Sequence, residues 1–324
     1  MDQSLMFKEV IKDELVQFDA YLNKALKNDK SHVTEIVEYA FKRDGKRIRP
    51  MLVFLVAKAC GEVSSATYHG AVTVELLHSA TLIHDDVVDE SLMRRGRQSV
   101  NAIFDNKRAV LAGDYVLSSS LVESAKTENL EVISLIAELG KNLAEGELNQ
   151  YALADQVLID EDRYFDVIDK KTASLLYACT KIGAITAGAS RDVIEAFGEV
   201  GRSIGIAFQI QDDIFDYFPA DVGKPTGNDI REGKITLPLI YALENASEEK
   251  REQMMSIIGS KNYTTDNIEL LLDFAKEFGG IEHAEKVKNE YLIKSESILN
   301  KLPLNQDYKE ALELLLFYLK NRRY

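Results

Sequence analysis

The chain has 324 residues, 46% of them hydrophobic, and its formal net charge of −14 argues against a nucleic-acid-binding surface, which needs positive charge to meet phosphates. Its 2 cysteines are too few for a disulfide framework, and its 5 prolines leave long stretches without a helix breaker. The chain shows neither a basic leader followed by an apolar run nor about 18 consecutive apolar residues, so we expect no signal peptide, no transmembrane segment and a cytoplasmic location.

Apolar residues follow the helical period almost throughout the chain. Helices are predicted over residues 5–28, 32–42, 65–90, 99–126, 130–155, 161–188 and 190–217, and another begins near Pro50 and ends at Gly61. Two prolines and three glycines predict a loop over 218–234, and shorter helices broken near Asn245, Gly259, Gly280 and Pro303 follow. No strand pattern and no linker is evident, so we expect one all-α domain over residues 1–324.

The same acidic pattern, D-D-x-x-D, ends two of the predicted long helices. Its first copy is Asp85-Asp86-Val87-Val88-Asp89, and its second is Asp212-Asp213-Ile214-Phe215-Asp216. Residues four apart lie on one helix face, where like charges repel. Mg²⁺ removes that cost, because it prefers oxygen ligands and takes one or two carboxylates with water and phosphate completing its shell. A solvated acidic face is the alternative for one copy, but both copies follow apolar sequence, where bare carboxylates are costly.

Basic residues stand near both acidic patterns in the sequence. Arginine offers a bidentate fork to phosphate oxygens, and lysine offers a compact charge. Taken singly, each of these residues would be read as a surface charge. The set comprises Lys46, Arg49, Arg94, Arg95, Lys170, Lys171, Lys224 and Lys234.

These motifs resemble those of the trans-isoprenyl diphosphate synthases, the family of farnesyl, geranylgeranyl and longer-chain polyprenyl synthases, and most of all its octaprenyl and heptaprenyl type. They run in the family's order from about residue 43 to residue 238. The matching segments are Gly45-Lys46-Arg47-Ile48-Arg49-Pro50, His78 with the first aspartate cluster, Arg94-Arg95-Gly96, Lys171-Thr172, Phe208-Gln209-Ile210-Gln211-Asp212-Asp213, Gly223-Lys224 and Gly233-Lys234.

The resemblance implies a bundle of long antiparallel helices around a central cavity, a homodimer, and no nucleic-acid partner. It also implies a prenyltransferase that condenses isopentenyl diphosphate with an allylic prenyl diphosphate, using several Mg²⁺ ions, and that could touch a membrane peripherally to release its product. The implied metal ligands are Asp85, Asp89, Asp212, Asp213 and Asp216. The implied catalytic residues are Asp85, Asp86, Asp89, Lys171, Thr172, Gln209 and Asp212.

The basic residues divide between the two substrates in this resemblance. Thr172 and Gln209 are expected to present oxygen dipoles to a developing carbocation. Lys46, Arg49, His78 and Arg95 are expected to hold isopentenyl diphosphate. Arg94, Lys171, Gln209, Lys224 and Lys234 are expected to contact the allylic substrate.

Product length is expected to depend on the residues before the first aspartate cluster. Family members that stop at short products carry bulky aromatics four or five residues before the first aspartate, where this chain has Thr81 and Ala80. Small residues there predict an open tunnel and a medium-to-long product. The alternative is that these small residues only allow close packing of helices.

Other functions remain open at this point. The product could be short, as in a farnesyl or geranylgeranyl diphosphate synthase, or the chain could be a non-catalytic partner subunit of another synthase. A terpene cyclase also uses D-D-x-x-D but would not need Lys46, Arg49 and His78. A metal-dependent phosphohydrolase could use His69, His78 and the His84-Asp85 pair.

Overall fold

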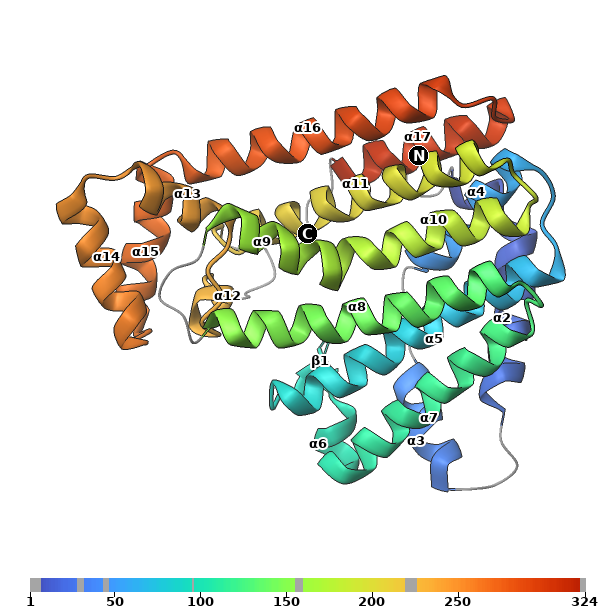
Figure 1. Ribbon diagram of the computed structural model, residues 1–324. Coiled ribbons are helices and arrows are strands. Elements are labelled where there is room, and N and C mark those ends of the chain that lie inside the picture. Colours follow the sequence, from blue (N-terminus) through green and yellow to red (C-terminus); the bar gives the residue numbers. More distant parts are fainter. Residues whose placement is uncertain are drawn as a thin grey trace. The chain divides into compact units, whose positions relative to one another are not determined.

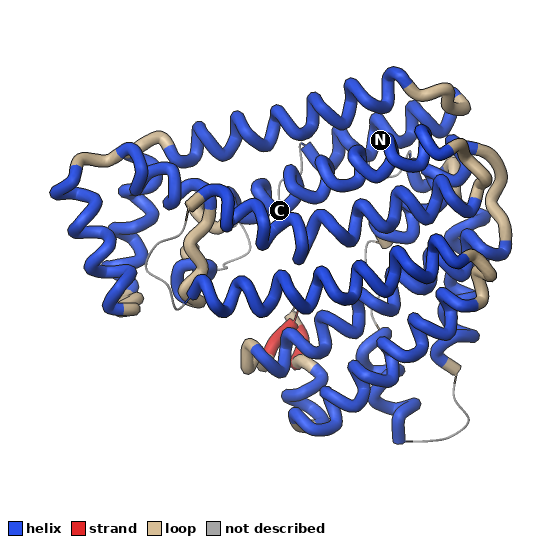
Figure 2. The backbone as a smooth tube through the Cα atoms, in the orientation of Figure 1, coloured by secondary structure: helices blue, strands red, loops and turns tan. Residues whose placement is uncertain are grey.

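The computed structural model describes residues 7–27, 32–42, 47–94, 96–154, 160–218 and 226–320, and most of them are helical (Figure 2). The chain forms two compact units, which we describe separately. The first unit comprises Met1–Gly140, Leu175–Gly198 and Leu302–Leu315, and the second comprises Lys141–Ser174, Glu199–Lys301 and Leu316–Tyr324. The all-α prediction is confirmed, whereas the single domain over 1–324 and the central cavity stay predictions.

The first unit is built around two buried helices, α4 (Ile48–Cys60) and α5 (Ser65–Val88) (Figure 1). Every residue of α4 from Pro50 to Ala57 is buried, as expected of a helix that is apolar on all sides. A capping box between Ser64 and Thr67 begins α5. Around these helices lie α2 (Lys12–Leu26), α3 (His32–Phe41), α6 (Val100–Phe104), α7 (Asn106–Ala125) and parts of α8 (Leu130–Ala154), α10 (Ser174–Thr186), α11 (Arg191–Phe215) and α17 (Gln306–Lys320).

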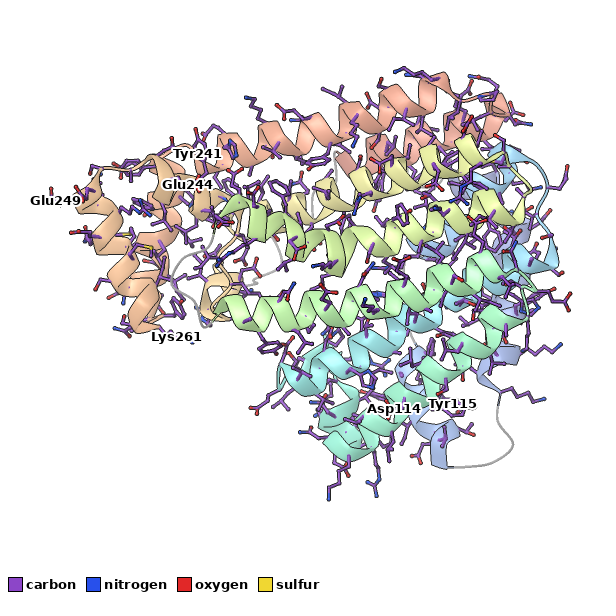
Figure 3. The ribbon with its side chains drawn as sticks, viewed as in Figure 1. Asp114, Tyr115, Tyr241, Glu244, Glu249 and Lys261 are labelled. Carbon is purple, nitrogen blue, oxygen red and sulfur yellow. The ribbon has the colours of Figure 1, made fainter. Side chains whose placement is uncertain are left out.

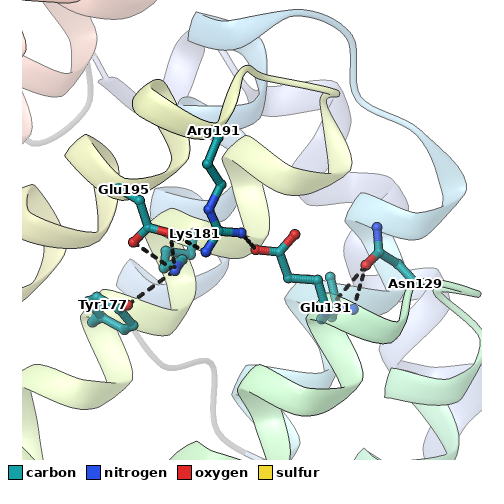
Figure 4. Close-up of polar contacts among 7 residues, drawn as sticks. Asn129, Glu131, Tyr177, Lys181, Arg191 and Glu195 are labelled. Carbon is teal, nitrogen blue, oxygen red and sulfur yellow. Dashed lines mark hydrogen bonds and ion pairs between the residues drawn. The ribbon is translucent and has the colours of Figure 1, made fainter.

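Ion pairs join the starts of two helices to a third helix inside the first unit (Figure 4). Lys181 of α10 is almost fully buried and donates hydrogen bonds of 3.1 Å to both carboxylate oxygens of Glu195 on α11. Arg191, at the start of α11, pairs with Glu195 and with Glu131 at the start of α8. A buried ammonium is tolerated only with such partners, so the network ties the starts of α8 and α11 to the middle of α10 in this unit.

Two predictions for the first unit need correction. A short hairpin of β1 (Met93–Arg94) and β2 (Arg97–Gln98) forms where no strand was expected, because two-residue strands are too short to show alternation. The helix predicted over 99–126 is broken at Asp105, whose backbone has a φ of 77° and whose side chain accepts the N–H of Arg108 at 2.9 Å. Aspartate favours such N-capping positions over helix interiors, which explains the break.

The second unit contains the rest of α8 and α11 together with α9 (Glu161–Ile168), a π-helical turn η1 (Asp169–Ala173), α12 (Asn228–Arg231), α13 (Leu237–Asn245), α14 (Glu248–Ser260), α15 (Thr265–Glu277) and α16 (Gly280–Lys301). Its core includes Ile210, Leu239, Leu271 and Phe274. The predicted breaks near Asn245, Gly259 and Gly280 are confirmed.

The short α12 and the π-turn are the corrections in the second unit. The segment 218–234 was predicted as a loop, and α12 lies inside it; the segment 161–188 was predicted as one continuous helix, and η1 interrupts it. None of the helices within the described residues is long and apolar enough to cross a membrane.

Candidate active site

The first aspartate cluster lies where α5 ends. Asp89 is the C-cap residue, and Glu90 follows with a left-handed φ of 50°. The N–H of Ser91 bonds the carbonyl of Asp86 at 2.9 Å, and the N–H of Glu90 bonds that of Val87 at 3.4 Å. This is the Schellman arrangement, in which glycine usually takes the left-handed position. A glutamate there is strained by order of 1 kcal/mol, a cost typical of functional sites.

The three aspartates of this cluster differ sharply in their surroundings. Asp86 is 4% exposed, and one of its oxygens accepts from Nε of Arg94 at 2.8 Å and from Nη2 at 2.6 Å. Asp86 thereby anchors the β1–β2 hairpin to α5 and orients the guanidinium of Arg94. Asp85 is partly exposed and Asp89 is exposed. The latter two are therefore the carboxylates accessible to an ion or a substrate.

Arg49 and His78 lie on the two buried helices of the first unit. Arg49 is in the first turn of α4, preceded by Arg47 in the left-handed conformation with a φ of 55°. Arg47 pairs with the buried Glu75 of α5 at 2.7 Å, one turn before His78. Burial raises the pKa of the Cys179 thiol to about 12, and the charges of Arg49 and Glu75 both act on it, so these residues share one region. Lys46 and Arg95 lie outside the described residues.

The second aspartate cluster lies where α11 ends. The last turn is tightened by i→i+3 bonds such as Asp216 N–H to Asp213 carbonyl at 3.2 Å. The carboxylate of Asp216 then caps α12, accepting the N–H groups of Asn228 and Asp229 at 3.0 Å each. Gly227, just before α12, has a φ of 72°, and a Cβ there would overlap with Ile268 of α15, so glycine lets the start of α12 lie against α15.

Asp213 is the buried member of the second cluster, with 4% of its surface exposed. Its carboxylate accepts from the hydroxyl of Tyr164 at 2.6 Å and from Nε2 of Gln209 at 2.8 Å. Burial raises its pKa to about 6, against the lowering effect of these two hydrogen bonds. Asp212 is partly exposed, so it corresponds in its surroundings to Asp85 of the first cluster.

Asp229 is a candidate residue that the sequence reasoning missed. Burial, followed by the charges of Asp213 and Asp216, raises its pKa to about 8. A fourth carboxylate thus stands beside the second cluster. The only signal in the sequence was its place between Gly227 and Lys234 in the segment predicted as a loop.

The π-turn η1 carries the predicted pair Lys171 and Thr172. Such single π-turns occur preferentially at functional sites. Two glycines let neighbouring helices approach it. A Cβ on Gly146 of α8 would lie 3.0 Å from Cβ of Lys170, and one on Gly205 of α11 would overlap with the Cα of Ala173.

The side chains that η1 presents are held by carboxylates and amides of the second unit. Lys171 pairs with Glu147 at 2.5 Å and donates to the side-chain oxygen of Gln150 at 3.2 Å. The hydroxyl of Thr172 donates to Oε1 of Gln209 at 2.7 Å. Lys234 pairs with Glu232 at 2.6 Å, and Lys224 lies outside the described residues. The second unit therefore brings together Lys171, Thr172, Gln209 and Asp213.

We expect Gly205→Ala to displace η1. The added methyl would meet the backbone of Ala173, and overpacking of this kind costs about 1–3 kcal/mol. The melting temperature and the catalytic rate should both fall. Gly140→Ala in α8 is the control, because a Cβ there meets nothing within 4 Å and should be neutral or stabilising by about 0.5–1 kcal/mol. Equal effects of the two substitutions in calorimetry and activity assays would contradict the role of Gly205.

The accessible carboxylates are better suited to Mg²⁺ than to a metal ion whose ligands all come from the protein. Within the described ranges, no three or more His, Cys, Asp or Glu side chains are gathered to hold an ion. Mg²⁺ needs only one or two carboxylates and keeps water or phosphate as its other ligands. Asp85 and Asp89 in the first unit, and Asp212 in the second, each offer hard oxygen donors with access to solvent, which suits such ions.

The histidines near the first cluster do not assemble into a metal site. His69 Nδ1 lies 2.6 Å from the buried Glu123. His84 lies 3.3 Å from the Val110 carbonyl on α7, and Gly113 leaves room for its ring, since a Cβ there would lie 2.9 Å from Cε1. His84 Nε2 also lies 3.3 Å from a carboxylate oxygen of Asp114, so its ring is held by α7, and the geometry gives no support to a His-Asp phosphohydrolase.

The two positions expected to govern product length differ in exposure. Ala80 is 1% exposed, so its methyl is packed against other atoms. Thr81 is partly exposed and lies one turn before Asp85. Of the two, Thr81 is the position that borders accessible space.

Comparison with known proteins gives one consistent family. The sequence profile described as "Polyprenyl synthetase" matches residues 30–274. The octaprenyl diphosphate synthase of Escherichia coli K12 is 34% identical over 307 residues, which cover 94% of each chain.

Solved structures agree with the sequence comparison. A decaprenyl diphosphate synthase from Rhodobacter capsulatus superposes with a TM-score of 0.93 at 33% identity, covering 99% of this chain and 100% of the other. A geranylgeranyl pyrophosphate synthase from Bacteroides thetaiotaomicron superposes with a TM-score of 0.86 at 41% identity, with the same coverage. These similar proteins therefore make products of different lengths.

Proposed function

Because the chain belongs to the polyprenyl synthetase family, its activity is that of a prenyltransferase, and we propose that it condenses isopentenyl diphosphate head-to-tail with an allylic diphosphate to give a medium-to-long all-trans polyprenyl diphosphate. The observation that carries this proposal is the pair of D-D-x-x-D motifs, each at a helix end and each with accessible carboxylates. One such motif would be a common acidic surface. Two, in a chain of this family, match the need to bind diphosphate.

The proposed chemistry begins with departure of the allylic diphosphate. Mg²⁺ ions, held by Asp85 and Asp89 in the first unit and by Asp212 in the second, would supply positive charge that stabilises this leaving group. Arg94 and Lys171 add positively charged hydrogen-bond donors that stabilise the negative charge developing on the diphosphate in the transition state. Thr172 and Gln209 present hydroxyl and amide oxygens to the allylic carbon as it becomes cationic.

The second substrate would be held by Arg49 and His78 of the first unit. Its double bond attacks the allylic cation, and a proton is then lost. No side-chain base stands out in the sequence, so we assign the proton to the released diphosphate. The ion pairs seen for Lys171 with Glu147 and for Lys234 with Glu232 must loosen for these lysines to bind phosphate.

A medium-to-long product is the finer part of the proposal. It is supported by the small residues Ala80 and Thr81 and by the similarity to octaprenyl and decaprenyl synthases. The alternative is a geranylgeranyl product, which the 41% identity to the Bacteroides enzyme favours. Sizing of the reaction products distinguishes the two.

A homodimer is also proposed. Leu111, Leu121 and Val122 of α7 are 67%, 50% and 55% exposed, on the helix that also carries Asp114 (Figure 3). A cluster of exposed apolar side chains on one helix is typical of a protein interface. Light scattering should give about twice 36.4 kDa, and a monomer mass would contradict it. The cytoplasmic location and contact with a membrane stay predictions.

The decisive experiment is to incubate the purified chain with isopentenyl diphosphate, farnesyl diphosphate and Mg²⁺. We expect polyprenyl diphosphates longer than farnesyl, and a loss of turnover of at least about 10³-fold in excess chelator, because metal-ion stabilisation of transition-state charge is worth several kcal/mol. Activity should return on addition of Mg²⁺. Turnover that persists in chelator, or no condensation at all, would contradict the proposal.

A further inference from the structure

A row of hydrogen-bonded side chains runs through three elements of the second unit. It begins at Tyr164 on α9, passes through Asp213 and Gln209 on α11, and ends at Thr172 on η1. The three donor–acceptor distances are 2.6, 2.8 and 2.7 Å. Tyr164 and Asp213 are buried, whereas Gln209 and Thr172 are partly exposed. The row therefore links the core of the unit to two residues assigned to the reaction.

The chemistry of these groups gives the row one direction. A carboxylate only accepts hydrogen bonds, so Asp213 accepts one from the amide nitrogen of Gln209. The amide oxygen of Gln209 then faces Thr172. The hydroxyl hydrogen of Thr172 is then donated to the amide oxygen of Gln209. The lone pairs of the Thr172 oxygen are left to point elsewhere, which is what a neighbour of a developing cation needs.

We propose that Tyr164 and Asp213 are positioning residues that fix the amide of Gln209, and through it the hydroxyl of Thr172, and that Asp213 is not a metal ligand. The inference rests on the proposed function, because Thr172 and Gln209 matter only if a cation forms beside them. Each oxygen of Asp213 already accepts one hydrogen bond, and its side chain is 4% exposed. The partly exposed Asp212 is left as the ion-binding member of this pair.

Tyr164→Phe is the first test, because it removes only the hydroxyl and keeps the ring that packs on Phe165 at 5.3 Å. We expect kcat to fall about tenfold, as for loss of a hydrogen bond to a charged group. The KM values of both substrates and the Mg²⁺ concentration for half-maximal rate should stay within about twofold.

Tyr217→Phe is the matched control. Tyr217 is as deeply buried as Tyr164, in the same core, but its hydroxyl pairs with Thr236 at 3.3 Å and not with Asp213. It should show a comparable fall in melting temperature with kcat within about twofold of wild type. Equal falls in kcat for the two variants would overturn the inference.

Asp213→Asn tests the same row without touching a tyrosine. An asparagine amide can donate a hydrogen bond to the side-chain oxygen of Gln209, so the Gln209 amide can rotate and turn its nitrogen toward Thr172. The hydroxyl of Thr172 would then lose the oxygen that accepts its hydrogen bond. We expect kcat to fall by at least about tenfold with the Mg²⁺ dependence unchanged. The double variant with Tyr164→Phe should be no slower than Asp213→Asn alone, because both act on one network.

The outcomes separate this inference from the proposed function. If the wild-type chain does not condense the substrates, the proposed function is wrong. If the wild type is active and Asp213→Asn needs a severalfold higher Mg²⁺ concentration, only the inference is wrong, and Asp213 is a metal ligand after all. Unchanged Mg²⁺ dependence with reduced kcat in both Tyr164→Phe and Asp213→Asn supports it.

Discussion

Asp85→Asn and Asp212→Asn should each lower kcat/KM by on the order of 10³-fold or more, while the protein stays folded. Both carboxylates are partly exposed at the end of a long helix, so losing their charge removes ion binding without opening the core. Metal-assisted stabilisation of a leaving group is worth several kcal/mol, and each 1.36 kcal/mol is a factor of ten in rate. Single-turnover kinetics at saturating Mg²⁺ and thermal unfolding would measure both effects.

The neighbouring Asp86 supplies a contrast on the same helix. It is buried, whereas its partner Arg94 is 37% exposed, so the substitution mainly weakens a hydrogen bond to a charged group, which costs about 1.5–3 kcal/mol. Asp86→Asn should therefore lower the melting temperature clearly, whereas Asp85→Asn should not. Glu249→Gln, on the exposed face of α14 (Figure 3), controls for loss of a negative charge as such. Wild-type rates for Asp85→Asn or Asp212→Asn would refute the assignment of the two clusters.

The sequence predicted the helices well because apolar spacing is set by burial, which is the dominant energy of this fold. Both aspartate clusters fall at helix ends as expected. The π-turn at Lys171 was missed, because one extra residue in a turn barely alters the apolar pattern over 161–188. It depends on Gly146 and Gly205, whose approach to the turn is a tertiary contact that local spacing cannot reveal.

The different roles within each cluster were also beyond the sequence. The D-D-x-x-D pattern does not distinguish its aspartates. In the structure, however, the second aspartate of each copy, Asp86 or Asp213, is 4% exposed and hydrogen-bonded. Asp216 caps α12, accepting the N–H groups of Asn228 and Asp229. These roles depend on Arg94, Tyr164 and the backbone of α12, which lie 8, 49 and 12 residues away. In the first motif Asp85 is partly exposed and Asp89 is exposed, and in the second motif Asp212 and Asp216 are partly exposed.

Thr81→Phe should shorten the product by one or more five-carbon units. Thr81 is partly exposed one turn before Asp85, so a ring there can enter the space that the growing chain would use. The melting temperature should fall less than in Ala80→Phe, since Thr81 is partly exposed and Ala80 is buried. Thr265→Phe, at the exposed start of α15, is the matched control and should leave the product lengths as in the wild type.

Ala80→Phe should also shorten the product, but with a cost in stability. Ala80 is 1% exposed, so the ring has to displace packed neighbours, and overpacking of this kind costs about 1–3 kcal/mol. Chromatography of the dephosphorylated products and calorimetry of both variants would separate a lost tunnel from a damaged core. An unchanged product range in Thr81→Phe, with a shortened one only in the less stable Ala80→Phe, would mean that the small residues serve helix packing and that another position limits chain growth.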